Sequence, residues 1–149
     1  MCIFRCLGKE CPSHCCGPYG GVCDNLRPLG SVRMSEIILL PKDTVALERA
    51  GYSHLIRRDA SGITKIDTAP DGTCAALADG RCSVYAYRPA ICRAYPLYLD
   101  MFSGVCTLTE CKAVPDDICL EDYPEMLENL LEIYLHWIDF YRKKLCPQR

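Results

Sequence analysis

The distribution of cysteine constrains this chain more than any other feature of its sequence. There are 13 cysteines in 149 residues. One group lies within residues 2–23 and a second within 74–119, whereas residues 24–73 contain none. Cysteines buried singly in a core would not gather in this way, so we expect the fold to bring the first group against the second. The first group is Cys2, Cys6, Cys11, Cys15, Cys16 and Cys23, the second is Cys74, Cys82, Cys92, Cys106, Cys111 and Cys119, and Cys146 stands apart.

The start of the chain predicts a cytoplasmic protein. Arg5, Lys9 and Glu10 interrupt it before the apolar region of a signal peptide could form. The longest apolar run, "IILL" at 37–40, is far too short to span a membrane. Structural disulfides are rare in a reducing cytosol, where dense cysteines indicate metal binding or redox chemistry. The odd number of cysteines and the adjacent pair Cys15–Cys16 also fit a framework of paired bridges poorly.

Length and charge narrow the class of protein further. The length suits one domain over residues 1–149. A formal net charge of -2 gives no electrostatic basis for binding nucleic acid or an anionic membrane. A protein or peptide remains a candidate partner or substrate.

The segment without cysteines predicts short, ordinary elements. "SEIILL" at 35–40 is typical of a short strand or of the approach to a helix. Pro41 could open a helix that continues over 42–51 and ends at Gly51. Residues 56–67 predict two short strands around the turn Ser61–Gly62. The fold class we expect is a small, irregular α+β domain organised by its cysteine clusters.

The second cysteine group lies in a stretch rich in turns, followed by a long helix. The turns at 70–72 and at Asp79–Gly80 precede Cys74 and Cys82, and turns allow ligands to converge. Pro89 and Pro96 are expected to keep the chain out of regular helix around Cys92. Residues 122–145 predict a C-terminal helix whose apolar stripe is read as core rather than as a groove for a partner. That stripe is Met126, Leu127, Leu130, Leu131, Tyr134, Trp137, Ile138 and Tyr141.

Clustered thiolates favour a soft metal. Zinc and iron–sulfur clusters usually take four protein ligands, and a site of four thiolates remains negatively charged. Arg88 and Arg93 bracket Cys92 and could donate to the ligands, or could form surface salt bridges. His14 could be a ligand, a donor to the ligands or an exposed side chain. The tyrosines around the second group, among them Tyr85, could pack around the metal or act as acid–base groups.

One block of the sequence carries a family resemblance. "CSVYAYRPAICRAYP" at 82–96, with Cys74 upstream and Cys6, Cys11, Cys15 and Cys16 in the first group, resembles the YkgJ-like cysteine-cluster family. That family is named for a CxxCxxCC signature, and the resemblance runs from about residue 4 to 111, although the first group is more widely spaced here. It implies a zinc- or iron-chelating domain. A similar cluster in flagellin lysine N-methylases implies that such a module can accompany the modification of a protein.

The resemblance implies a set of metal ligands and leaves the metal open. We favour one or two iron–sulfur centres slightly over zinc, because adjacent and irregularly spaced cysteines suit clusters better than zinc fingers. The alternatives are a small metalloenzyme or a component of a protein- or peptide-modifying system, and a structural zinc module that binds a partner. The remaining cysteines are expected to be spare or buried thiols, with a third metal site as the alternative. The ligand set is Cys6, Cys11, Cys15, Cys16, Cys74, Cys82 and Cys92, with Cys106 or Cys111.

Overall fold

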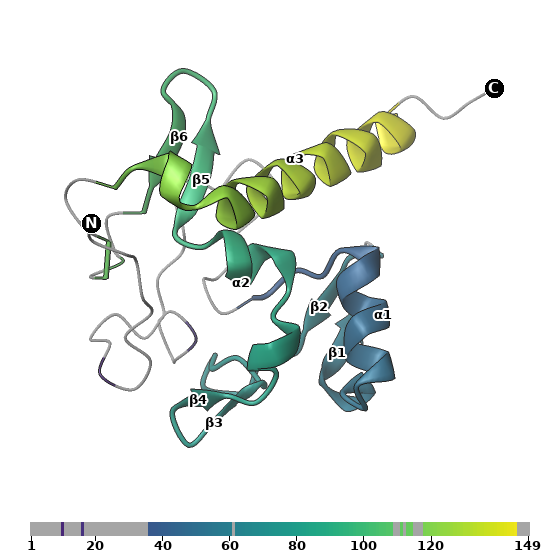
Figure 1. Ribbon diagram of the computed structural model, residues 1–149. Helices are drawn as coiled ribbons and strands as arrows, with labels where there is room; N and C mark the ends of the chain where they lie inside the picture. Colours follow the sequence, from purple (N-terminus) through teal and green to yellow (C-terminus); the bar gives the residue numbers. More distant parts are fainter. Residues whose placement is uncertain are drawn as a thin grey trace.

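Three α-helices and three two-stranded antiparallel sheets form the described part of the computed structural model (Figure 1). This confirms the α+β class. The residues described are 10, 16, 36–60, 62–108, 111, 113–114 and 118–145.

The first helix and the first sheet follow the local signals of the sequence. α1 spans Pro41–Arg49 with Pro41 in its first turn, and Gly51 adopts a φ of 86° just beyond its end, as predicted. A 3₁₀ turn, Ser53–Leu55, leads into β1 (Ile56–Arg58), which pairs with β2 (Thr64–Ile66). The segment before α1 joins this pair, because the Leu39 N–H donates to the Thr64 carbonyl at 2.9 Å. Both predicted strands are therefore confirmed.

A tight hairpin follows the turn at 70–72. β3 (Leu77–Ala78) pairs with β4 (Arg81–Cys82) across the two residues Asp79 and Gly80, whose φ values are 51° and 69°. Both angles lie in the left-handed region that Asp and Gly tolerate, so the predicted tight turn is confirmed. A second 3₁₀ turn, Tyr85–Tyr87, then leads to Pro89.

The expectation that two prolines exclude helix around Cys92 is wrong. α2 spans Ala90–Ala94 and contains Cys92. Pro89 stands at the N-cap, where its missing N–H costs no helical hydrogen bond, and Pro96 comes after the last helical residue. The two prolines therefore bound a short helix and do not abolish it. β5 (Leu97–Asp100) and β6 (Gly104–Thr107) form the next hairpin.

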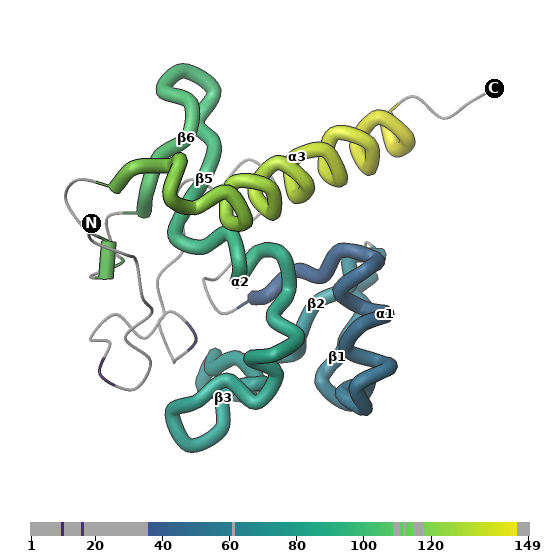
Figure 2. The backbone as a smooth tube through the Cα atoms, viewed as in Figure 1, coloured from purple at the N-terminus to yellow at the C-terminus, as the bar shows by residue number. Residues whose placement is uncertain are grey.

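The C-terminal helix is confirmed, but its apolar stripe is only partly core. A 3₁₀ turn, Leu120–Asp122, precedes α3, which spans Pro124–Leu145 and packs against α2 and β5. The end of α3 extends past α2 and the β5–β6 hairpin (Figure 2). Leu131 and Ile138 are 47% and 63% exposed, which corrects their prediction as core. The helical period identifies the apolar residues of a helix but not how much of it other elements cover.

Buried side chains form two separate clusters. The first, the cysteine-side core, is built from the short elements between residues 37 and 84, and its described members include no residue of α3. The second, the helical core, lies where α2, β5 and α3 meet. The cysteine-side core is Ile37, Leu39, Leu47, Leu55, Ile66, Cys74, Ala76 and Val84, and the helical core is Ala94, Leu97 and Leu130 with the side chains that pack on them.

A buried carboxylate joins α1 to α2. Asp43 is 3% exposed, and its Oδ2 accepts the backbone N–H groups of Leu40 at 3.1 Å and Ala90 at 3.2 Å. Its Oδ1 lies 3.7 Å from Nη2 of Arg93. One side chain therefore satisfies donors at the start of both helices and holds α2, the helix of Cys92, against α1.

Candidate metal centre

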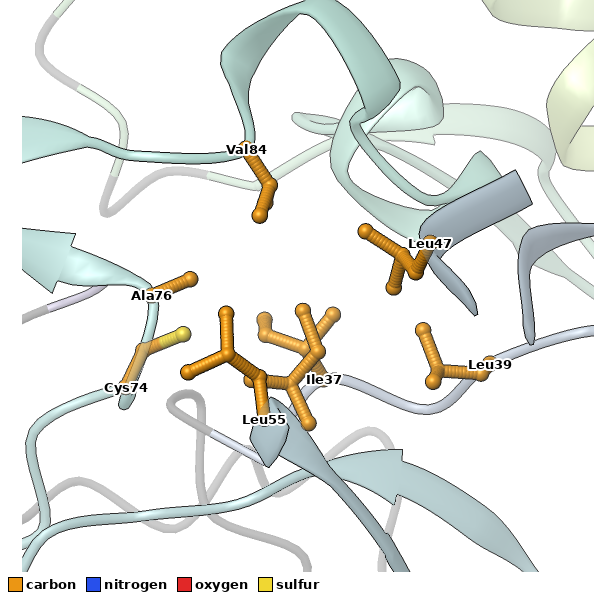
Figure 3. Close-up of a cluster of buried hydrophobic side chains, with 8 residues drawn as sticks. Ile37, Leu39, Leu47, Leu55, Cys74, Ala76 and Val84 are labelled. Carbon is orange, nitrogen blue, oxygen red and sulfur yellow. The ribbon is translucent and has the colours of Figure 1, made fainter. Parts of the chain in front are cut away.

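Four of the described cysteines lie in the cysteine-side core or pack against it. Cys74 is a member of the core and is 4% exposed, with its sulfur turned toward the neighbouring apolar side chains (Figure 3). Cys16, Cys82 and Cys92 are partly buried and pack against the same core. The structure therefore places one cysteine of the first group and three of the second around the same core.

Each of these four thiols is positioned by backbone hydrogen bonds. The Thr73 N–H donates to the Asp71 carboxylate at 2.9 Å, which fixes the turn before Cys74. The Cys74 N–H then donates to the Cys16 carbonyl at 2.9 Å and ties the two cysteine groups together. Cys82 lies in β4 opposite Leu77 in β3. The Cys92 N–H donates to the Pro89 carbonyl at 2.9 Å in the first turn of α2.

The surroundings of Cys74 shift the pKa of its thiol in opposite directions. Burial raises the pKa of the Cys74 thiol above 9.0, and the neighbouring Cys82 adds to this rise. Hydrogen bonds from the backbone N–H groups of Ala76 and Leu77 lower the same pKa. Burial is the largest effect, so the thiolate form needs a cation beside it, while the two N–H groups are donors suited to a thiolate sulfur. A bound metal ion is such a cation.

The two predicted arginines lie beside this region with partners of their own. Arg93 faces Asp43, and the guanidinium of Arg88 stacks 4.1 Å from the centre of the Tyr85 ring. The Nε atoms of both arginines are buried without a hydrogen-bond partner among the described residues. Tyr85 is 59% exposed, so its ring lies at the surface of this region. Donation from these arginines to metal ligands stays a prediction.

The other predicted ligands lie elsewhere or outside the described residues. Cys106 is half-exposed on β6, and Cys111 is 8% exposed in the segment after it. Neither is among the residues of the cysteine-side core, and the same holds for the exposed Cys119. Outside the described residues lie Cys6, Cys11, Cys15 and His14, together with Cys2, Cys23 and Cys146.

The described residues alone do not complete a metal site. Within the described ranges, no three His, Cys, Asp or Glu side chains lie close enough together to hold one ion. The chemistry of the gathered donors nevertheless fits zinc or iron, because soft thiolates are the ligands that both metals share.

Sequence reasoning missed Asp43, which positions the helix of Cys92. Its place in the first turn after Pro41 is typical of an acidic residue at a helix start. Its contact with Ala90, 47 residues away, is set by the tertiary fold and has no local signal.

Comparison with known families identifies the class of protein. Residues 5–120 match the family CxxCxxCC, described as a "putative zinc- or iron-chelating domain", and the chain belongs to this family. The match covers the segments that contribute all four cysteines at the cysteine-side core. Searches of curated proteins and of solved structures found no match. None of the helices in the described ranges has the length and apolar character needed to cross a membrane.

Proposed function

We propose that this protein binds zinc or iron through thiolates gathered at the cysteine-side core. The observation that carries the proposal is that Cys74 lies in one core and Cys16, Cys82 and Cys92 pack against it, although the four come from different segments. Thiols are soft donors, and the family description, a zinc- or iron-chelating domain, is consistent with such ligands. Cys16 belongs to the first cysteine group. We propose Cys6, Cys11 and Cys15 of that group as further ligands, with Cys106 or Cys111.

The site would contribute to folding as well as to chemistry. The strands around it are two or three residues long, and sheets of this size are marginal on their own. A metal bound by thiolates from distant segments would hold them together, because ligands far apart in the chain are brought together only in the folded state.

Within this proposal we favour an iron–sulfur centre slightly over zinc. The first group places Cys15 directly before Cys16, and adjacent side chains diverge too far for one small tetrahedral site. A cluster of several irons, or two neighbouring centres, accommodates such a pair more readily. Zinc in a closed site of four thiolates is the alternative, and its chemistry would be structural.

Elemental analysis of the chain purified without oxygen tests whether the protein binds a metal and which metal it binds. Iron with sulfide at several atoms per chain would support a cluster, whereas zinc at one or two per chain would support the closed site. Absence of both metals would refute metal binding altogether. Metal content should be normalised to protein determined by amino-acid analysis.

Single substitutions test where the metal lies. Cys74→Ser and Cys82→Ser should each lower the metal content, because oxygen is a poor replacement for a thiolate ligand. Cys119→Ser is the matched control, since Cys119 is exposed and not among the residues of the cysteine-side core. Equal metal loss in all three variants, or in none, would contradict a site at this core.

A further inference from the structure

The C-terminal half of α3 carries apolar side chains that no other described element covers. Leu135 and Ile138 are 66% and 63% exposed, and Leu145 is 75% exposed. The first half of the helix is different, because Leu130 is buried in the helical core and Tyr134 bonds to Leu99 of β5. The second half extends beyond these contacts (Figures 1 and 2).

These exposed side chains have the spacing of a coiled-coil seam. Leu131, Leu135, Ile138 and Leu145 succeed one another at steps of four, three and seven residues. Steps of four and three keep side chains on one face of a helix that packs along a second helix. Arg142 occupies the position between Ile138 and Leu145.

The rings of the same segment stabilise the helix itself. Trp137 stacks on Tyr141 at a centroid distance of 5.8 Å and meets Phe140 edge-on at 5.4 Å. Asp139 pairs with Arg142 and Lys143 one turn later. These contacts lie within α3, so the helix is supported without a neighbour while its leucine–isoleucine face stays open.

The charges along α3 indicate what covers this face. The first half carries Glu125, Glu128 and Glu132, of which Glu132 pairs with Lys42 of α1, whereas the last turn carries Arg142, Lys143 and Lys144. A second copy lying parallel would place Arg142 beside Arg142 and Glu128 beside Glu128. A second copy lying antiparallel would place each acidic half beside the basic end of the other helix.

We propose that α3 pairs antiparallel with α3 of a second copy of this chain. Leu135 of one copy would lie opposite Ile138 of the second copy, and Leu131 opposite Arg142. Arg142 would then lie about one helical turn along the contact from Glu128 of the second copy. The contact is isologous, because a two-fold axis exchanges the two helices, and the pair closes as a dimer.

Sedimentation velocity of the full chain over a concentration series tests this pairing. A reducing buffer prevents disulfide-linked dimers from forming. We expect a reversible dimer that Leu135→Glu weakens roughly a hundredfold or more, because each dimer buries this leucine twice. Glutamate is as good a helix former as leucine, so circular dichroism should show the helix intact. Met101→Glu is the matched control, since Met101 is 89% exposed at the end of the β5–β6 hairpin, and it should leave the dimer unchanged.

Charge reversal tests the antiparallel direction. Glu128→Lys and Arg142→Glu should each weaken the dimer by about three- to tenfold, and the double variant should recover most of that loss. A parallel pair would show no such recovery, because residues 128 and 142 would not meet. A monomer at every concentration, or a dimer insensitive to Leu135→Glu, would also overturn the proposal. A monomer at every concentration would mean that another segment or a different protein covers the face.

Discussion

The cysteine-side core and the helical core are held together by different means. The first gathers short strands, turns and α1 between residues 37 and 84, and a thiol is one of its buried side chains. The second rests on α3, a helix of 22 residues, packed against α2 and one hairpin, with no cysteine among its described members. Long helices and hairpins bring their own backbone hydrogen bonds, whereas two-residue strands bring few. A metal bound as proposed should therefore stabilise the cysteine-side core far more than the helical core.

Metal removal should have the largest effect and should be confined to one core. A structural zinc site contributes on the order of 10 kcal/mol of apparent binding free energy. Chelation under reducing conditions should therefore remove amide-exchange protection from residues 37–92 and retain it in the first half of α3. Hydrogen exchange followed by mass spectrometry measures both. Equal loss of protection in both cores would contradict the predicted difference between them.

Truncation of one leucine in each core tests how far the stability of that core depends on metal. Leu47 and Leu130 are 0% and 3% exposed, so Leu47→Ala and Leu130→Ala should each lower the free energy of unfolding by about 2–5 kcal/mol in the metal-bound protein. After chelation, Leu130→Ala should still reduce stability while Leu47→Ala should not.

Urea denaturation measures both changes. Val45→Ala on the exposed side of α1 is the control, with an expected change within about 0.5 kcal/mol. If Leu47→Ala lowers the free energy of unfolding equally without metal, the cysteine-side core folds on its own. The predicted difference between the two cores would then be absent.

Local signals explain which parts of the fold could be predicted from the sequence. Pro41 and Gly51 bound α1, and Asp79–Gly80 forms the β3–β4 turn, because these residues restrict or permit particular backbone angles wherever they stand. Pro89 showed the limit of this reasoning. A proline opens a helix as readily as it breaks one, and the outcome depends on the residues that come after it.

The candidate site could be predicted in outline only. Uneven cysteine spacing predicted that the two groups meet, and the structure places Cys16 beside Cys74. The tertiary arrangement decides which cysteines lie at the core. It places Cys74, Cys82 and Cys92 there and Cys106 on a separate hairpin, although the elements that carry them have similar local sequences. The contact of Asp43 with Ala90 is of the same kind, because each partner is ordinary in its own segment.

Asp43 connects α1, beside the cysteine-side core, to α2, which leads to the helical core. Asp43→Ala would leave the Leu40 and Ala90 N–H groups without their acceptor, which should cost about 2–3 kcal/mol of stability. Asp43→Asn keeps an acceptor oxygen and should recover roughly half of this cost. Thermal unfolding of the metal-bound variants measures the difference. Equal stability of the two variants would mean that the hydrogen bonds do not join the cores.

A smaller effect is expected inside the helical core. The Tyr134 hydroxyl donates to the Leu99 carbonyl at 2.6 Å and accepts the Leu99 N–H at 3.2 Å, which fixes α3 on β5. Tyr134→Phe should lower the free energy of unfolding by about 1 kcal/mol with and without metal. Tyr141→Phe is the control, because it keeps the ring contacts with Trp137 and Phe140. Dependence of the Tyr134→Phe effect on metal would show that the two cores unfold together.

The smallest contrast concerns two aspartates whose pKa values move in opposite directions. Burial raises the pKa of Asp43 above 3.8 despite its hydrogen bonds from Ala90 and Leu40. The part of its stability that is linked to protonation is therefore full below pH 3.8 and is lost as pH rises through the folded pKa, whereas its oxygens accept these hydrogen bonds in either form. Hydrogen bonds from the Ser103 and Phe102 N–H groups lower the pKa of Asp100, so its contribution is present above pH 3.8 and is lost as pH falls through the folded pKa. Carboxyl-carbon NMR titration should place the pKa of Asp43 above 3.8 and that of Asp100 below it. Shifts of the same sign would show that burial does not distinguish buried Asp43 from half-buried Asp100 in the hairpin.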